Sequence, residues 1–143
     1  MGASVFAYWP GITPRQLKAQ PGFGNDCKAW GDFVGELASA PKAYTEIERA
    51  GAEALLTFRT QGLDDKDVDW QEPAAVEKAA HVLLPLVRSQ DRGLRLALKL
   101  YAKNAIGDAP VHEELAQDLD DIAALARWAR KAGAKQMTFD INW

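Results

Sequence analysis

The two ends of the chain carry its clearest β-strand signals, and these constrain the fold more than any other feature. Residues 4–9 read Ser-Val-Phe-Ala-Tyr-Trp, a run rich in β-branched and aromatic types that Pro10-Gly11 closes. Residues 137–143 alternate apolar and polar side chains, as a half-buried strand does. Because a strand needs a partner for its backbone groups, we expect the two ends to pair in a small sheet.

Two helices are expected in the first third of the chain. Thr13-Pro14 supplies a capping hydroxyl and a proline at the first helical position, which predicts a short helix through Leu17. After a loop, Asn25 or Asp26 can cap a second helix, and Pro41 is expected to end it. The apolar positions of this second helix recur at helical spacing: Trp30, Phe33, Val34 and Leu37.

Further helices are expected in the second half. One begins near Pro73 and bends or ends at Pro85, because proline has no amide hydrogen to donate. Another spans roughly residues 111–132, with acids early and bases late, and Gly133 stops it. Residues 94–101 fit a strand or a helix, and their good helix formers favour the helix. The apolar stripes of the two long helices are Val76, Ala79, Ala80, Leu83 and Leu84, and Leu115, Leu119, Ile122, Leu125, Ala126 and Ala129.

Residues 43–62 leave two alternatives open. Tyr44 and Ile47 fit a helix, and residues 54–60 can continue that helix or form a strand. Length and spacing favour the helix, with Gly62 as its stop. Together the elements predict an α+β fold, a mostly helical single domain over residues 1–143, with a small sheet containing the paired N- and C-terminal strands.

Charge and cysteine content restrict the partners and the compartment. The net charge of -3 repels phosphate backbones, so no nucleic acid is expected. No run approaches the ~20 consecutive apolar residues that span a bilayer, and the first residues lack the basic region of a secretory signal, so no membrane is expected. Cys27 is the one cysteine and cannot form an internal disulfide, which favours a cytoplasmic location.

The sequence contains no recognisable motif for catalysis, cofactor binding or metal binding. Glycine-rich phosphate loops and the G-x-S-x-G elbow are both missing. The two histidines, His81 and His112, lack the spacing of a zinc site, so we expect them to touch solvent. We therefore predict no catalytic residue, no metal and no cofactor.

One acidic segment is the candidate partner-binding site, and it comprises Asp64, Asp65, Asp67, Asp69 and the following Trp70. Its alternating aspartates are typical of a calcium loop. Such a loop also needs glycine at its sixth position and glutamate at its twelfth, and this chain has Trp70 and Val76 there. A solvated acidic loop is the simpler interpretation, and with its tryptophan it predicts a docking site for a cationic protein surface.

The five tryptophans divide into core and interface candidates. Trp30 is expected in the core, and Trp128 at the border of the buried stripe, three positions from Leu125. Trp9, Trp70 and Trp143 are interface candidates, because tryptophan is enriched at binding hot spots.

Several segments resemble the YfbM-like family of bacterial proteins of unknown function. They are the Met-Gly opening with its short strand, Thr13-Pro14-Arg15-Gln16-Leu17, residues 68–76, Asp118-Leu119-Asp120-Asp121-Ile122, and Gly133 with the last strand. The resemblance covers about half of the chain, and residues 23–63 depart from the family pattern. It implies an α+β fold with paired terminal strands and carries over no catalytic residue.

These observations favour a non-catalytic protein-binding domain. Small size, acidity and missing catalytic motifs fit an immunity-type protein that neutralises a cognate bacterial toxin, whose basic domain would be the partner. The alternative is a small enzyme whose site is assembled from scattered histidines and carboxylates, in a pocket lined by His81 or His112. A third possibility is an oligomer-forming role through an exposed edge of the sheet.

Overall fold

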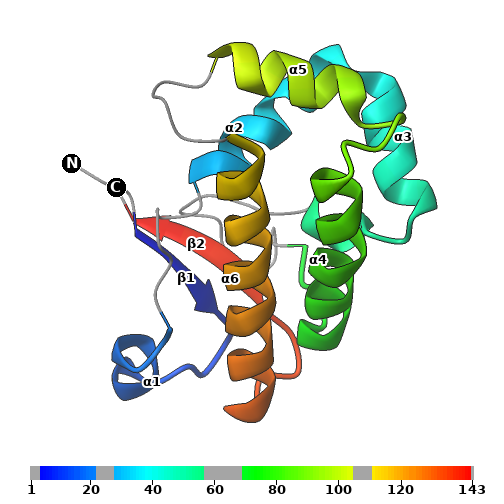
Figure 1. The fold of residues 1–143 in the computed structure, drawn as a ribbon. Coiled ribbons are helices and arrows are strands. Elements are labelled where there is room, and N and C mark those ends of the chain that lie inside the picture. The colour runs from blue at the N-terminus through cyan, green and yellow to red at the C-terminus, as the bar shows by residue number, and fades with distance from the viewer. Residues whose placement is uncertain (1–3, 22–27, 57–68, 105–110, 143) are drawn as a thin grey trace.

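The structure, a computed structural model, describes residues 4–21, 28–56, 69–104 and 111–142. These residues are mostly helical and include one two-stranded sheet (Figure 1). The helices are α1 (Pro14–Lys18), α2 (Lys28–Glu36), α3 (Pro41–Arg49), α4 (Pro73–Arg88), α5 (Arg95–Asn104) and α6 (Val111–Lys131), with 3-10 turns η1 (Leu37–Ser39) and η2 (Glu53–Leu55). The strands are β1 (Ser4–Tyr8) and β2 (Thr138–Asn142). The predicted α+β class is confirmed.

The two terminal strands pair with each other, as the sequence predicts. β1 runs antiparallel to β2, with Val5 opposite Ile141 and Ala7 opposite Phe139. The outer edge of β1 is capped at Ala7 by the side-chain amide of Gln20, which accepts from the Ala7 N–H and donates to the Ala7 carbonyl, both at 2.8 Å. One primary amide thus takes the place of a neighbouring peptide group and satisfies the two backbone hydrogen-bonding groups of Ala7 at this edge.

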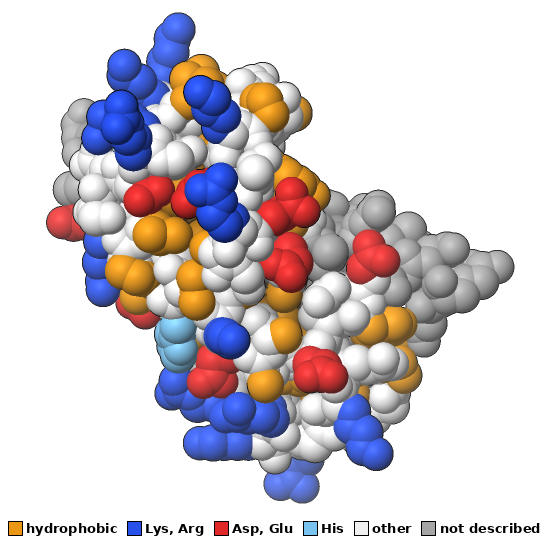
Figure 2. All heavy atoms as spheres, turned by 90° about the vertical axis from the view of Figure 1, so that its right-hand side faces the viewer, with side chains coloured by type: hydrophobic (Ala, Val, Ile, Leu, Met, Phe, Trp, Pro, Cys, Tyr) orange, Lys and Arg blue, Asp and Glu red, His pale blue; other side chains and the backbone are white. Residues whose placement is uncertain are grey.

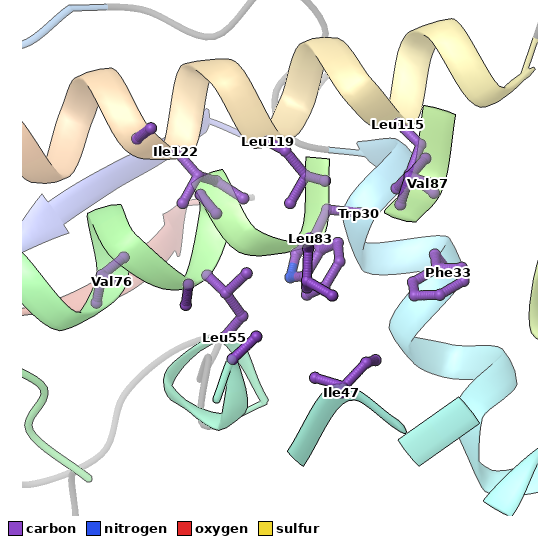
Figure 3. Packing of buried hydrophobic residues seen from close by; sticks show 14 of the residues in the cluster. Trp30, Phe33, Ile47, Leu55, Val76, Leu83, Val87, Leu115, Leu119 and Ile122 are labelled. Atoms are coloured by element: carbon purple, nitrogen blue, oxygen red, sulfur yellow. The ribbon is translucent and has the colours of Figure 1, made fainter. Parts of the chain in front are cut away.

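The core lies between α4, α6 and the sheet, and α2 and α3 close it at one end. α4 and α6 lie side by side, with the sheet against α6 and with α2, α3 and α5 at the other end of the molecule from α1 (Figure 1). Figure 3 shows Leu83 of α4 and Leu119 of α6 pointing toward each other beside Trp30 of α2. All six predicted apolar positions of α6 are buried, and of the five on α4 Leu84 alone is partly exposed.

Pro85 lies inside α4, so of the two predicted alternatives, a bend or an end at this residue, the end is wrong. The helix continues for one more turn to Arg88. Proline removes one helical hydrogen bond, at a cost of about 3 kcal/mol in a helix interior. The side chain of Val87 is fully buried in the last turn, and burying a valine stabilises by about 1.5–3 kcal/mol, which offsets much of that cost.

Pro41 begins a helix, and the expectation that the preceding helix runs up to it is wrong. α2 ends at Glu36, η1 follows, and Ala40 leaves the helical region with φ of -139° and ψ of 67°. Pro41 then occupies the first position of α3. That position suits proline, because its amide would have no helical acceptor and its fixed φ matches the helix.

The helical alternative for residues 43–62 is confirmed only as far as Arg49. Gly51 adopts φ of +80°, and the Ala52 N–H donates to the Ile47 carbonyl at 3.0 Å, which closes α3 with a Schellman motif. The chain then forms η2, so neither a continuous helix nor a strand covers residues 50–56. Gly62, the predicted stop, lies outside the described residues.

Other local predictions are confirmed. Thr13 caps α1 in a capping box, with its Oγ1 accepting from the Gln16 N–H at 3.1 Å and the Gln16 Oε1 accepting from the Thr13 N–H at 2.9 Å. The ambiguous segment after Gly93 is the helix α5. α6 ends at Lys131, two residues before Gly133, which adopts φ of +99°.

Candidate functional site

The predicted acidic site is only partly described. Asp64, Asp65 and Asp67 lie outside the described residues. Asp69 is exposed, and Trp70 is half-buried with its ring stacked on Tyr8 at 6.2 Å between centroids and 28° between planes. The structure therefore brings the end of the acidic segment next to the last residue of β1, a proximity that the sequence gives no means of predicting.

The residue after Trp70 is fixed to the sheet. Gln71 and Met137 exchange two backbone hydrogen bonds, of 3.0 Å and 2.7 Å, in an isolated antiparallel bridge just before β2. Trp70 is thus held on both sides, by the ring of Tyr8 and by the bridge at Gln71. A side chain whose backbone is held in this way loses less conformational freedom when a partner binds it.

The other tryptophans belong mainly to the core. Trp30 is 2% exposed, as predicted, and Trp128 is partly buried at the edge of the cluster, also as predicted. Trp9 is 7% exposed and packs against Trp128 at 5.7 Å between ring centroids, so its prediction as an interface residue is wrong. The strand pattern that ends at Trp9 does not indicate which side of the sheet α6 covers. Trp143 lies outside the described residues.

A polar groove of about 430 Å³ lies along the first half of α6. His112, Glu113 and Asp120 line it, with Arg88 at the end of α4 forming an ion pair with Asp120 at 3.7 Å. Among the described residues, the buried Nδ1 atom of His112 has no hydrogen-bond partner. One histidine and two carboxylates thus line the groove. His81, which is exposed on α4, does not line it.

Asp118 is a buried carboxylate with a structural role. It is fully buried on the inner side of α6, and its Oδ2 accepts from the backbone N–H of Trp30, in the first turn of α2, at 2.9 Å. A carboxylate at a helix start satisfies a free amide and interacts favourably with the helix dipole. Asp118 thus caps α2 from another helix. The Asn25 or Asp26 cap that the sequence predicts lies outside the described residues.

Tyr101, on the inner face of α5, has a pKa that departs from the ordinary value of a tyrosine. Burial, and then the negative charges of Glu114, Asp118 and Asp32, raise the pKa of Tyr101 to about 12. All of these causes disfavour the phenolate. Tyr101 therefore remains a neutral packing residue, with its ring edge against Phe33 at 6.4 Å.

Two groups of cations on the surface differ in their partners (Figure 2). At the end of the molecule where α6 stops, Arg127 and Arg130 both approach Glu77, at 3.2 Å and 3.6 Å. At the other end, α5 and the turn before it present cations with no ion pair among the described residues: Arg92, Arg95, Lys99 and Lys103.

The signal for this second group of cations is present in the sequence. Residues 92–104 contain no acid, and the four cations recur at steps of three or four residues, which places them on one side of a helix. The apolar pattern of the same segment predicts the helix, whereas no binding site was predicted from its cations.

The described part of the chain shows neither a metal-binding cluster nor a membrane-spanning helix. No three His, Cys, Asp or Glu side chains among the described residues lie close enough to hold a metal ion. No described helix combines the length and the apolar character needed to cross a membrane. The chain matches no known protein family model, no curated protein and no solved structure. The resemblance to the YfbM-like family therefore stays a prediction.

Proposed function

We propose that this chain is a non-catalytic protein-binding domain, of the immunity type, that uses the acidic segment and Trp70 to bind a basic domain of a bacterial toxin. The observation that supports it best is the position of Trp70. Its ring is partly exposed, stacked on Tyr8 and preceded by the exposed Asp69. An aromatic ring that stacks on Tyr8 can make a strong contact once water is excluded, and the aspartates that precede it in the sequence supply charges that attract a basic partner.

The two components would act on different steps of binding. Asp64, Asp65, Asp67 and Asp69 carry four negative charges within six residues, against one positive charge from Lys66. Such charges raise the association rate with a cationic surface and make it depend on salt. The Trp70 ring would govern dissociation, because removing a buried aromatic contact mainly changes the lifetime of a complex.

The test is affinity capture from a bacterial lysate, with the wild-type chain and two variants as bait. In the first variant, the four aspartates of the acidic segment are changed to lysine; in the second, Trp70→Ala, the ring alone is removed. A matched control bait reverses four exposed acids elsewhere: Asp32, Glu48, Glu53 and Glu113. The proposal requires a protein that the wild-type and control baits retain and that both site variants lose.

Binding of the captured protein is then measured with purified components. We expect the lysine variant to bind at least roughly tenfold more weakly, with most of the loss in the association rate. Unchanged affinity of both site variants would place the binding surface elsewhere. The immunity role predicts that the captured protein arrests growth when it is expressed alone and that co-expression of this chain restores growth; a captured protein without toxicity contradicts that role.

A second candidate function is supported by the groove on α6. His112 lies there with Glu113 and Asp120, which is the combination that general acid–base catalysis uses. This candidate predicts hydrolysis of p-nitrophenyl esters or phosphates above the buffer rate, with the excess abolished by His112→Ala. A rate equal to that of buffer, or one that His112→Ala leaves unchanged, contradicts an enzymatic role for the groove in these reactions.

A further inference from the structure

The outer face of α5 carries a stripe of unpaired cations. Arg92, Arg95, Lys99 and Lys103 are all exposed, whereas the inner face of α5 buries Ala97, Leu98 and Tyr101 in the core. Arg95, Lys99 and Lys103 form a row on one side of the helix because they recur at steps of four residues, and Arg92 lies in the turn just before it. Figure 2 shows Lys and Arg side chains gathered at the end of the molecule where Figure 1 places α5 and α3.

This row is unfavourable in the free protein. Arg95 and Lys99 are four residues apart, as are Lys99 and Lys103, and like charges at that spacing destabilise a helix. No acid between residues 92 and 104 relieves the repulsion. Local choices that disfavour the free chain are expected at functional surfaces, where a partner compensates for them.

A large apolar side chain lies within the same row. Leu96 is 52% exposed, more than Tyr44 or Leu17, the other exposed large hydrophobic residues that the structure describes. It directly follows Arg95 and precedes Lys99 by three positions, so it stands among the cations. The face thus offers one apolar contact surrounded by positive charge.

A groove of about 420 Å³ adjoins the beginning of this helix. Gly93, which precedes α5, lies against Glu46 of α3 so closely that a Cβ at Gly93 would lie 2.6 Å from the Glu46 Cγ. Lys42 and Arg49 of α3 also line the groove, and Lys42 has no ion pair among the described residues. Arg49 forms an ion pair with Glu46 at 3.5 Å, so Lys42 is the cation through which the groove extends the positive surface from α5 onto α3.

We propose that the outer face of α5 and the turn before it, from Arg92 to Lys103, binds an acidic protein segment that carries an apolar side chain for Leu96. Charge complementarity identifies the occupant as anionic. Leu96 favours a protein, because an aliphatic side chain gains from another apolar side chain and gains little from a sugar-phosphate backbone. The net charge of -3 also opposes a nucleic acid.

The same geometry argues against a membrane surface as the occupant. A helix that lies on a membrane inserts a broad apolar face. The apolar face of α5 is already buried in the core, and among the large apolar residues of this helix Leu96 alone is exposed, by about half of its surface (52%). This inference does not depend on the proposed function, because the occupant has the opposite charge and the surface is a different one.

The test measures binding of a fluorescein-labelled, glutamate-rich peptide with one leucine per helical turn, by fluorescence anisotropy. The site variant is the triple change Arg95→Glu, Lys99→Glu and Lys103→Glu. The control variant, Lys78→Glu with Lys131→Glu and Lys135→Glu, alters the net charge equally at the opposite end of the molecule (Figure 1). Circular dichroism and thermal unfolding check that both variants are folded.

We expect the site variant to bind the peptide at least roughly tenfold more weakly and the control variant within about twofold of wild type. Leu96→Ala should weaken binding several-fold at any salt concentration, because the contact is apolar, whereas the loss from the charge variant should shrink as salt rises. If the triple variant does not fold, Lys99→Glu alone replaces it, since this change removes both repulsive pairs.

Three results would overturn the inference. Equal losses in the site and control variants would show that only net charge matters. Tighter binding of wild type to an oligothymidine, or to vesicles containing phosphatidylserine, than to the peptide would assign the face to another class of partner. If the molecular mass of wild type in solution rises with concentration while that of the site variant stays at the value of a monomer, the occupant is a second copy of the chain.

Discussion

Two surfaces of this molecule use their cations in opposite ways. Between α4 and α6, Glu77 lies within reach of both Arg127 and Arg130, and Arg88 pairs with Asp120. On the outer face of α5, the cations have no such partners among the described residues. The chain therefore contains enough acid to pair surface cations where two helices meet, and it does not do so on α5. Charges that serve folding and charges free to serve binding are thus separated in space.

The largest expected difference between the two regions is in their leucines. Leu119 is buried between α6 and its neighbours, and Leu119→Ala should lower the free energy of unfolding by about 3 kcal/mol because a cavity remains. Leu96→Ala, on the exposed face, should change the unfolding free energy by less than about 0.5 kcal/mol. Urea unfolding followed by tryptophan fluorescence measures both. A comparable cost for Leu96→Ala would mean that this leucine serves the fold.

The inner face of α5 should respond to high pH through Tyr101. Because the pKa of Tyr101 is raised to about 12 in the folded state, from 10.0, the stabilisation by the protonated phenol is complete below pH 10 and is lost as pH rises through 12. The expected loss is about 2–3 kcal/mol. The free energies of unfolding of wild type and Tyr101→Phe, compared between about pH 9 and about pH 12, isolate this effect. Parallel pH profiles for the two proteins would contradict it.

The contact between α4 and α6 should lose stability when the carboxylate of Glu77, which two arginines share, is neutralised. Glu77→Gln removes the charge that Arg127 and Arg130 approach, and because the Glu77 side chain is only 14% exposed we expect a loss of about 1 kcal/mol. The loss should decrease in high salt. Glu48→Gln, at an exposed acid without an ion pair among the described residues, is the control and should have little effect. Equal effects of the two changes would remove the contrast between the regions.

The smallest expected effect has the opposite sign. Lys99→Glu converts two repulsive pairs, with Arg95 and Lys103, into attractive ones, and we expect stabilisation by about 0.5 kcal/mol. Lys103→Glu is the control, because it creates one pair in the less favourable order and places an acid in the last turn of the helix. Thermal unfolding at low salt detects the difference. Destabilisation by Lys99→Glu would show that this lysine makes a favourable contact within the fold.

Local patterns in the sequence were sufficient for much of the fold. The alternation at residues 137–143 and the apolar stripe of α6 each have one physical solution, because the side-chain period decides strand or helix. Proline is more ambiguous. Pro41 ends one helical pattern and begins another, and Pro85 is tolerated because Val87 is anchored in the core, a fact that depends on tertiary packing.

The candidate sites were predicted less completely, for reasons that also concern tertiary structure. Nothing in the order of residues indicates that Trp70 meets Tyr8, or that Trp9 faces Trp128 and is buried. Asp118 caps a helix that begins 90 residues before it in the chain. In contrast, the cationic row on α5 could be predicted from spacing alone, and its lack of ion pairs is what the structure adds.

The pairing of β1 with β2 has a consequence for how the molecule is synthesised. The partners in this sheet, such as Val5 and Ile141, are separated by almost the entire chain. Contacts between such distant positions carry a large loop-closure cost and form slowly. On a ribosome, the first strand emerges long before its partner exists, whereas Gln20 is only 13 residues from Ala7 and can occupy the outer edge of β1 early. The edge of β1 that β2 covers has to wait until β2 is synthesised, and it is the edge open to aggregation in the nascent chain.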